Sequence, residues 1–169
     1  MKVLWVEDQL RTADLLMAAA TSASRRRYGL DLVMARSLIE AERRLRLERF
    51  DLVITDLILP DSPEEEMTVT RIAAMGRFRM AIVSASHRRQ DIVAGLLKAG
   101  VNCAPTAIAK EDLALGEFVA RPDVFRDFLL SLTPAPAATR RRAPARLASL
   151  TPPRARRGLC IRTVTRAAD

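Results

Sequence analysis

The sequence has few of the residues that form disulfides and transition-metal sites. Its 169 residues include two cysteines, Cys103 and Cys160, which lie far apart and show no metal-ligand spacing. The single histidine, His87, has no second histidine or cysteine beside it, so we expect it at the surface rather than in a catalytic or metal-binding role. This scarcity predicts a reduced, cytoplasmic protein.

Long apolar runs are also absent. The run at 3–6 is followed at once by Glu7 and Asp8, and no run approaches the roughly 20 residues that a helix needs to cross a bilayer. We therefore expect no membrane or targeting segment.

Acidic residues are almost missing from the C-terminal part of the chain. Residues 134–169 hold nine arginines, five of the nine prolines and one acid, Asp169, which leaves 19 basic and 19 acidic residues in 1–133. The net charge of +8 therefore belongs to this tail. We expect 1–133 to form one domain and the tail to be disordered, because it cannot bury enough apolar surface to offset its ordering entropy.

The arginines of the tail make contact with nucleic acid possible, and only there. No aromatic residue or groove-reading helix accompanies them, so a non-functional or solubilising tail is the favoured interpretation.

What is present is a repeated strand and helix pattern. Five short apolar runs are typical of strands, at 3–6, 30–35, 52–55, 80–85 and 104–110. Ser37 is expected to cap the second helix, and Ser62 with Pro63 to begin the third. The last helix is expected from Pro122, since 111–121 show no clear pattern. Strands alternating with helices predict an α/β fold with a parallel sheet.

Two helices carry further expectations. The charged residues of 42–49 are most simply the solvated face of the second helix. In the helix after the fourth strand, Ile92, Val93, Leu96 and Leu97 should point inward, and Gly100 should end the helix.

Polar residues stand at the carboxyl ends of these strands. They are Glu7, Asp8, Asp56, Ser84 and Lys110. The carboxyl ends of parallel strands meet at one edge of a sheet, where ligands bind, so five separate segments would build one site. The plainer alternative is that Asp8 caps a helix and Asp56 starts a loop, because each acid alone is a weak motif.

With these motifs in this order, residues 1 to about 132 resemble the receiver domain of two-component response regulators. Val3-Leu-Trp-Val-Glu-Asp8 matches the acidic pair, and Asp51-Leu-Val-Ile-Thr-Asp-Leu-Ile-Leu-Pro60 matches the phosphoacceptor strand. Ser84-Ala85 matches the hydroxyl switch position, and Lys110 matches the lysine. The resemblance implies a doubly wound, five-stranded, flavodoxin-like fold with strand order 2-1-3-4-5.

The resemblance also implies a role for each site residue. Asp56 would be the phosphoacceptor, and Glu7, Asp8, Asp56 and the backbone carbonyl of Ile58 would hold Mg²⁺. Ser84 and Lys110 would bind the phosphoryl group and switch the loops. Clustered carboxylates repel one another, so a divalent cation is expected on charge grounds too, and Mg²⁺ leaves room for phosphate oxygens.

The implied partners are a histidine kinase or phosphotransfer protein and a downstream protein, with a homodimer left open. The chain would not be an enzyme beyond self-phosphorylation and autodephosphorylation. A phosphohydrolase using an aspartyl intermediate would need a second acid two residues after the nucleophile, where Ile58 stands.

Some positions depart from the receiver pattern. Ala107 stands where a switch aromatic is usual, Glu111 where a proline is common after the lysine, and Glu64 where a glycine is typical. The stretch from Gly100 to Lys110 is also longer than usual. These departures favour an alternative, in which the chain is a receiver-like interaction module that works without phosphorylation.

Overall fold

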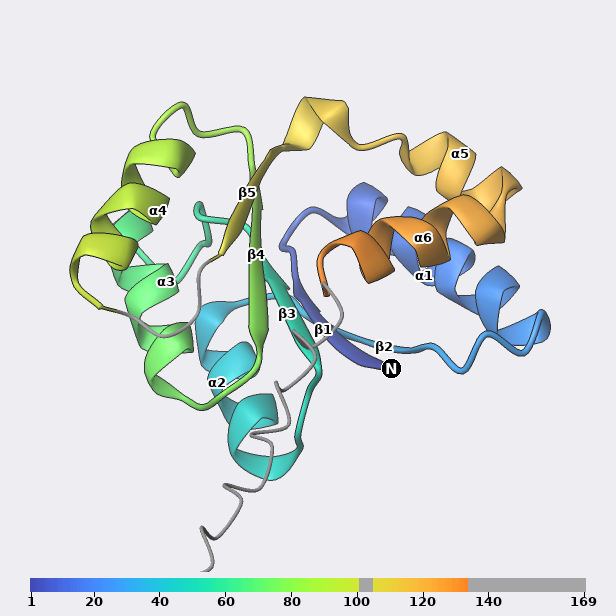
Figure 1. Ribbon diagram of the computed structural model, residues 1–169, viewed down its shortest axis with the longest axis horizontal. Coiled ribbons are helices and arrows are strands. Elements are labelled where there is room, and N and C mark those ends of the chain that lie inside the picture. The colour runs from blue at the N-terminus through green and yellow to red at the C-terminus, as the bar shows by residue number, and fades with distance from the viewer. Residues whose placement is uncertain (101–104, 134–169) are drawn as a thin grey trace, which may run out of the picture. The chain divides into compact units, whose positions relative to one another are not determined.

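Figure 1 shows the computed structural model, which describes residues 1–100 and 105–133. The predicted tail, Cys103 and the first residue of the predicted fifth strand, Ala104, lie outside the described residues. The sheet has five parallel strands: β1 (Lys2–Val6), β2 (Asp31–Ala35), β3 (Leu52–Thr55), β4 (Arg79–Ser84) and β5 (Thr106–Ala109). Their order in the sheet is β2-β1-β3-β4-β5, which confirms the predicted doubly wound topology.

Helices cover both faces of this sheet (Figure 1). In chain order they are α1 (Leu10–Arg25), α2 (Leu38–Leu47), α3 (Glu65–Ala74), α4 (Arg89–Lys98), the 3-10 turn η1 (Lys110–Asp112), α5 (Leu115–Ala120) and α6 (Pro122–Ser131). One layer contains α2, α3 and α4, and the other contains α1, α5 and α6. None of the described helices combines the length and apolarity needed to span a bilayer.

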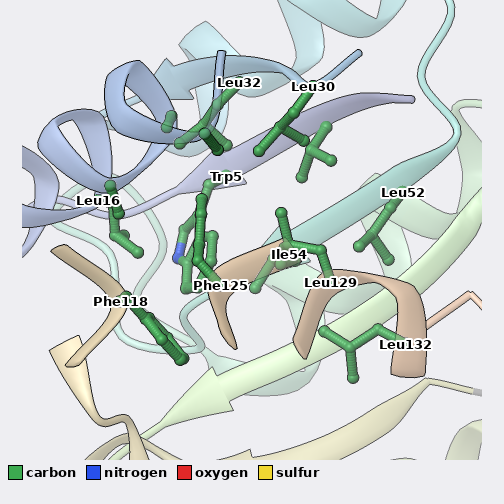
Figure 2. Packing of buried hydrophobic residues seen from close by; sticks show 14 of the residues in the cluster. Trp5, Leu16, Leu30, Leu32, Leu52, Ile54, Phe118, Phe125, Leu129 and Leu132 are labelled. Atoms are coloured by element: carbon green, nitrogen blue, oxygen red, sulfur yellow. The ribbon is translucent and has the colours of Figure 1, made fainter. Parts of the chain in front are cut away.

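Alternate residues of β1 belong to two separate cores. Trp5 faces α1, α5 and α6, where its ring stacks on Phe128 with centroids 6.3 Å apart. Figure 2 shows Trp5 among Phe118 and Phe125, whose centroids lie 5.2 Å apart. Leu4 faces the other core, with α2, α3 and α4. Each such buried side chain contributes about 1.5–3 kcal/mol, so packing against both helix layers stabilises β1 in the middle of the sheet.

Two predicted helix boundaries are confirmed by their caps. The Ser37 hydroxyl accepts a hydrogen bond from the Glu40 N–H at 3.1 Å, which satisfies one of the free amides at the start of α2. Gly100 follows the end of α4 with φ of +71°, a conformation that glycine adopts without steric cost. His87 is exposed, as expected.

Three local predictions are wrong. Ser62 does not cap α3, which begins at Glu65; its hydroxyl instead contacts Thr68. Glu42 is buried and not on the solvated face of α2, because its carboxylate accepts a hydrogen bond from Arg71 of α3 at 2.6 Å. Leu97 is 52% exposed. For Ser62 and Glu42 a contact with α3 decided what local patterning could not.

Candidate functional site

The carboxyl ends of β1 and β3 bring two acids to the same level of the sheet. Val6 pairs with Thr55, so Glu7 and Asp56 follow neighbouring strand ends. Their backbones continue the hydrogen-bond ladder: the Asp56 N–H donates to the Val6 carbonyl at 3.1 Å, and the Glu7 N–H donates to the Ala35 carbonyl at 2.9 Å. Strand pairing alone therefore fixes the backbone positions of both residues, independently of their side-chain contacts.

Glu7, Asp8 and Asp56 form one acidic cluster. Each offers a carboxylate oxygen, and these three oxygens all lie within 4.8 Å of one another. Glu7 is fully buried, Asp56 is 5% exposed and Asp8 is half-buried. Three carboxylates at such spacing repel one another strongly once they are removed from water.

Lys110 reaches into this cluster from the turn after β5. Its Nζ lies 2.9 Å from Asp56 Oδ2 and 2.8 Å from each carboxylate oxygen of Glu7, and it donates a hydrogen bond to Glu7 Oε1 and to Asp56 Oδ2. All three side chains are largely buried. The lysine thus balances part of the negative charge, and the cluster of three carboxylates and one lysine remains negative overall.

Burial shapes the titration of this pair. It raises the pKa of Glu7 above its ordinary value of 4.5, although the hydrogen bonds from Lys110 and from the Gln9 N–H oppose the shift. For Lys110, burial alone would lower the pKa, but the hydrogen bonds and charges of Glu7 and Asp56 outweigh it, so the pKa is raised. Lys110 therefore stays charged at neutral pH.

The backbone after β3 turns around the Asp56 carboxylate. Asp56 Oδ1 accepts hydrogen bonds from the Leu57 N–H at 2.6 Å and the Ile58 N–H at 3.2 Å. Its two oxygens therefore face different groups, backbone amides on one side and Lys110 on the other. The Ile58 side chain is 56% exposed and takes no part in this turn.

Ser84 lies at the same edge but is not bonded to the acids. It ends β4, pairs with Ala109 just before Lys110, and is fully buried. Its hydroxyl oxygen accepts the Ser86 N–H at 3.2 Å, and within 1–100 and 105–133 it makes no hydrogen bond to Asp56 or Lys110. The fold thus gathers all the predicted site residues at one edge, with Ser84 set apart.

The donor set suits a hard divalent cation. Glu7 Oε2 is buried and forms no hydrogen bond within the described part of the chain, although it lies close to Lys110 Nζ. A buried carboxylate oxygen of this kind, next to two further carboxylates, is a ligand that Mg²⁺ prefers. The residues present therefore fit that ion.

Sequence reasoning missed two residues that contact the loops of the site. Arg36 Nη2 donates to the Asp8 carbonyl at 3.1 Å, and the Asp61 carboxylate accepts two backbone amides at the start of α2. Arg36 had a usable signal, because it directly follows the second strand. Asp61 had none, since its partners lie 22 and 23 residues away.

Solved structures with this fold include several response regulator receivers. A two-component response regulator from Clostridium difficile has a TM-score of 0.56 at 14% identity, over 79% of this chain and 95% of that one. A CheY-like receiver domain protein from Methanospirillum hungatei gives 0.54 at 14%, over 77% and 96%. A response regulator from Thermotoga maritima, solved in complex with Mg²⁺-BeF, gives 0.52 at 19%, over 78% and 97%.

These likenesses establish that the chain has the CheY-like receiver fold, as its sequence motifs suggest. No protein-family model matches the chain, and no curated protein matches it in sequence.

Proposed function

We propose that this protein is a phosphoacceptor receiver of a two-component phosphorelay, in which Asp56 takes a phosphoryl group with Mg²⁺ bound beside it. The observation that carries the proposal is the buried contact of Lys110 with both Glu7 and Asp56, next to a third acid, Asp8. Fixed positive charge beside a carboxylate nucleophile is what phosphoryl transfer requires, because positioning and charge neutralisation account for most of its catalysis.

The proposed step needs little from the protein beyond this geometry. A carboxylate oxygen of Asp56 attacks the phosphorus, the bond from phosphorus to the donor's nitrogen or oxygen breaks, and the donor leaves with that electron pair. The product is an acyl phosphate on Asp56. Lys110 would stabilise the charge on the transferring group, and the Leu57 and Ile58 amides hold the carboxylate in place.

A magnesium ion at this site would neutralise charge on the phosphoryl oxygens. Glu7, Asp8, Asp56 and the backbone carbonyl of Ile58 are the residues proposed to hold it. Because Glu7 and Asp56 also bind Lys110, the lysine and the cation would share the same carboxylates.

Ser84 and Lys110 are proposed to bind the phosphoryl group and so to change the conformation of the neighbouring loop. The phosphoryl oxygens are strong acceptors, and within the described residues the Ser84 hydroxyl accepts the Ser86 N–H and donates no hydrogen bond. Donation of the Ser84 hydroxyl proton to a phosphoryl oxygen would draw Ser84 toward Asp56 and shift the loop after β4 between two arrangements. The output would be a changed protein surface. A histidine kinase or phosphotransfer protein would be the donor, and a downstream protein would bind that surface.

The experiment is phosphorylation of the full chain by acetyl phosphate, followed by intact mass. With Mg²⁺ we expect one phosphoryl adduct, which disappears with EDTA or in Asp56→Asn. Asp51→Asn is the matched control, because Asp51 lies at the opposite end of β3, exposed, and should leave the adduct unchanged. An adduct that survives Asp56→Asn, or none in the wild-type protein, would defeat the proposal.

One observation favours the second candidate, a receiver-like module that works without phosphorylation. Ala107, in the middle of β5, provides no aromatic ring to couple the site to the surface of β5. Partner binding that is equal in the wild-type protein and in Asp56→Asn, with and without acetyl phosphate, would support this candidate over the first.

A further inference from the structure

The loop between β3 and α3 is tied to another element by Asp61. This loop follows Asp56 and carries Ile58, whose carbonyl is a proposed metal ligand. Asp61 Oδ1 accepts the Leu38 N–H and Asp61 Oδ2 accepts the Ile39 N–H, both at 2.8 Å. Both carboxylate oxygens are therefore used, and both partners belong to the first turn of α2.

The bond suits a negative charge. The first amides of a helix lack partners within the helix, and the helix dipole favours an anion there. Although partial burial opposes it, the amides of Ile39 and Leu38 hold the pKa of Asp61 below its ordinary value. The contact is thus a charge-assisted, bidentate tie between two elements that are distant in sequence.

The same short segment also holds the other loop of the site. Arg36 Nη2 donates to the Asp8 carbonyl at 3.1 Å, and the Arg36 N–H donates to Glu40 Oε2 at 2.9 Å, which fixes the segment itself. Residues 36–39 therefore contact the loop after β1 and the loop after β3. Both loops carry proposed metal ligands.

A second anchor ties the β3–α3 loop to α3. The buried Thr68 hydroxyl of α3 lies 3.3 Å from the Leu57 carbonyl and 2.6 Å from Ser62 Oγ. In sequence, Ile58 lies between Leu57, which this anchor holds, and Asp61. Its position should therefore depend on both helices.

We infer that Asp61 is a positioning residue: through the first turn of α2 it sets the Ile58 carbonyl relative to Asp8 and so controls the affinity of the site for a divalent cation. The inference rests on the proposed function, because it concerns the cation of that site. Removal of Asp61 would take away the tie between this loop and α2 and leave the bonds within the loop and to Thr68. Partners of this outer kind commonly change metal affinity by about tenfold or more.

The test is calorimetric titration of Mg²⁺ alone into the full chain, without a phosphodonor. We expect Asp61→Ala to bind Mg²⁺ about tenfold more weakly than the wild-type protein. Asp61→Asn keeps one acceptor oxygen and should fall in between. Hydrogen exchange of the peptide that spans residues 57–62 should become faster in the same order.

Arg43→Gly is the matched control. Arg43 is exposed on α2, has no hydrogen bond or ion pair within the described ranges, and its replacement by glycine weakens α2 without touching either loop. It should lower the unfolding midpoint and leave Mg²⁺ affinity unchanged. Denaturation midpoints identify a variant that fails to fold. If Asp61→Ala does not fold, the Mg²⁺ affinity of Asp61→Asn decides the test.

Equal Mg²⁺ affinity in the wild-type protein and the folded Asp61 variants would overturn this inference and leave the proposed function standing. The same holds if Arg43→Gly weakens Mg²⁺ binding as much as the Asp61 variants do. Absence of Mg²⁺ binding in the wild-type protein would overturn the metal of the proposed function and this inference together.

Discussion

Two lysines at opposite ends of the sheet have the same local arrangement and differ mainly in burial. At the amino end, Lys2 Nζ lies 2.6 Å from Glu48 and 3.3 Å from Asp31, with 34% of the lysine side chain exposed. At the carboxyl end, Lys110 lies between Glu7 and Asp56 with 13% exposed. Each lysine therefore joins two carboxylates from different elements, yet among the described residues only the second pair of acids belongs to a group of three carboxylates close enough to hold a metal ion.

Because the cluster at the carboxyl end is buried, its contribution to folding depends on how well its charges are balanced. Exposed ion pairs are screened and contribute little to folding, whereas a buried charge that loses its partner costs several kcal/mol. Glu7 shows the effect: burial raises its pKa, while the hydrogen bond from Lys2 lowers the pKa of Glu48, whose side chain is 32% exposed. The first site should therefore contribute little to folding, and the second is the one that an added cation would be expected to stabilise.

Removal of each lysine should give the largest contrast between the two sites. Lys110→Met leaves Glu7 and Asp56 buried without their cation, and we expect it to lower the free energy of unfolding in EDTA by about 3 kcal/mol. Lys2→Met should leave the urea midpoint unchanged within error. Equal midpoints for the two variants in urea denaturation would contradict the comparison.

Neutralisation of Glu7 should change the free energy of unfolding less than Lys110→Met does, and in the opposite direction. Glu7→Gln removes a charge whose burial disfavours folding, so without metal we expect the protein to be unchanged or about 1 kcal/mol more stable than the wild type. Urea denaturation in EDTA measures this. A loss of stability as large as that of Lys110→Met would show that the Glu7 and Lys110 pair is net stabilising.

The pH dependence of the two sites should differ in sign, and this is the smallest effect. The pKa of Glu7 is raised in the folded state, so its contribution is fully present below the unfolded value of 4.5 and is lost as pH rises through the folded value. The pKa of Glu48 is lowered, so its contribution is present above 4.5 and is lost as pH falls through the folded value.

Unfolding free energies in EDTA across acid to neutral pH, compared among the wild-type protein, Glu7→Gln and Glu48→Gln, test this. The difference between the wild type and Glu7→Gln should become less favourable to the wild type as pH rises above 4.5. The difference between the wild type and Glu48→Gln should become less favourable to the wild type as pH falls below 4.5. Two differences of the same sign would refute the assignment of the shifts.

The sheet and its acidic edge were predictable because they depend on local patterns. Short apolar runs that end on polar residues mark buried parallel strands, so the positions of Glu7, Asp56 and Ser84 at strand ends could be read from sequence. The strand order needed the resemblance to receivers as well.

The contacts that complete the site were not predictable in this way. Lys110 meets Glu7 across 103 residues and Asp56 across 54, and Asp61 meets α2 across more than 20. The burial of Glu42 depends in the same way on Arg71 of α3. The strand pattern places Lys110 at the edge of the acids but does not give its hydrogen bonds, and the contacts of Asp61 and Glu42 form only when α2 packs against the β3–α3 loop and α3.

The most direct test of the central claim is the effect of Mg²⁺ on unfolding. If the acids at the carboxyl edge bind the ion, saturating Mg²⁺ should raise the free energy of unfolding of the wild-type protein, by about 2.7 kcal/mol at a hundred times its Kd. Glu7→Gln should respond much less. No shift in the wild-type protein, or the same shift in both, would contradict a magnesium site built on Glu7, Asp8 and Asp56.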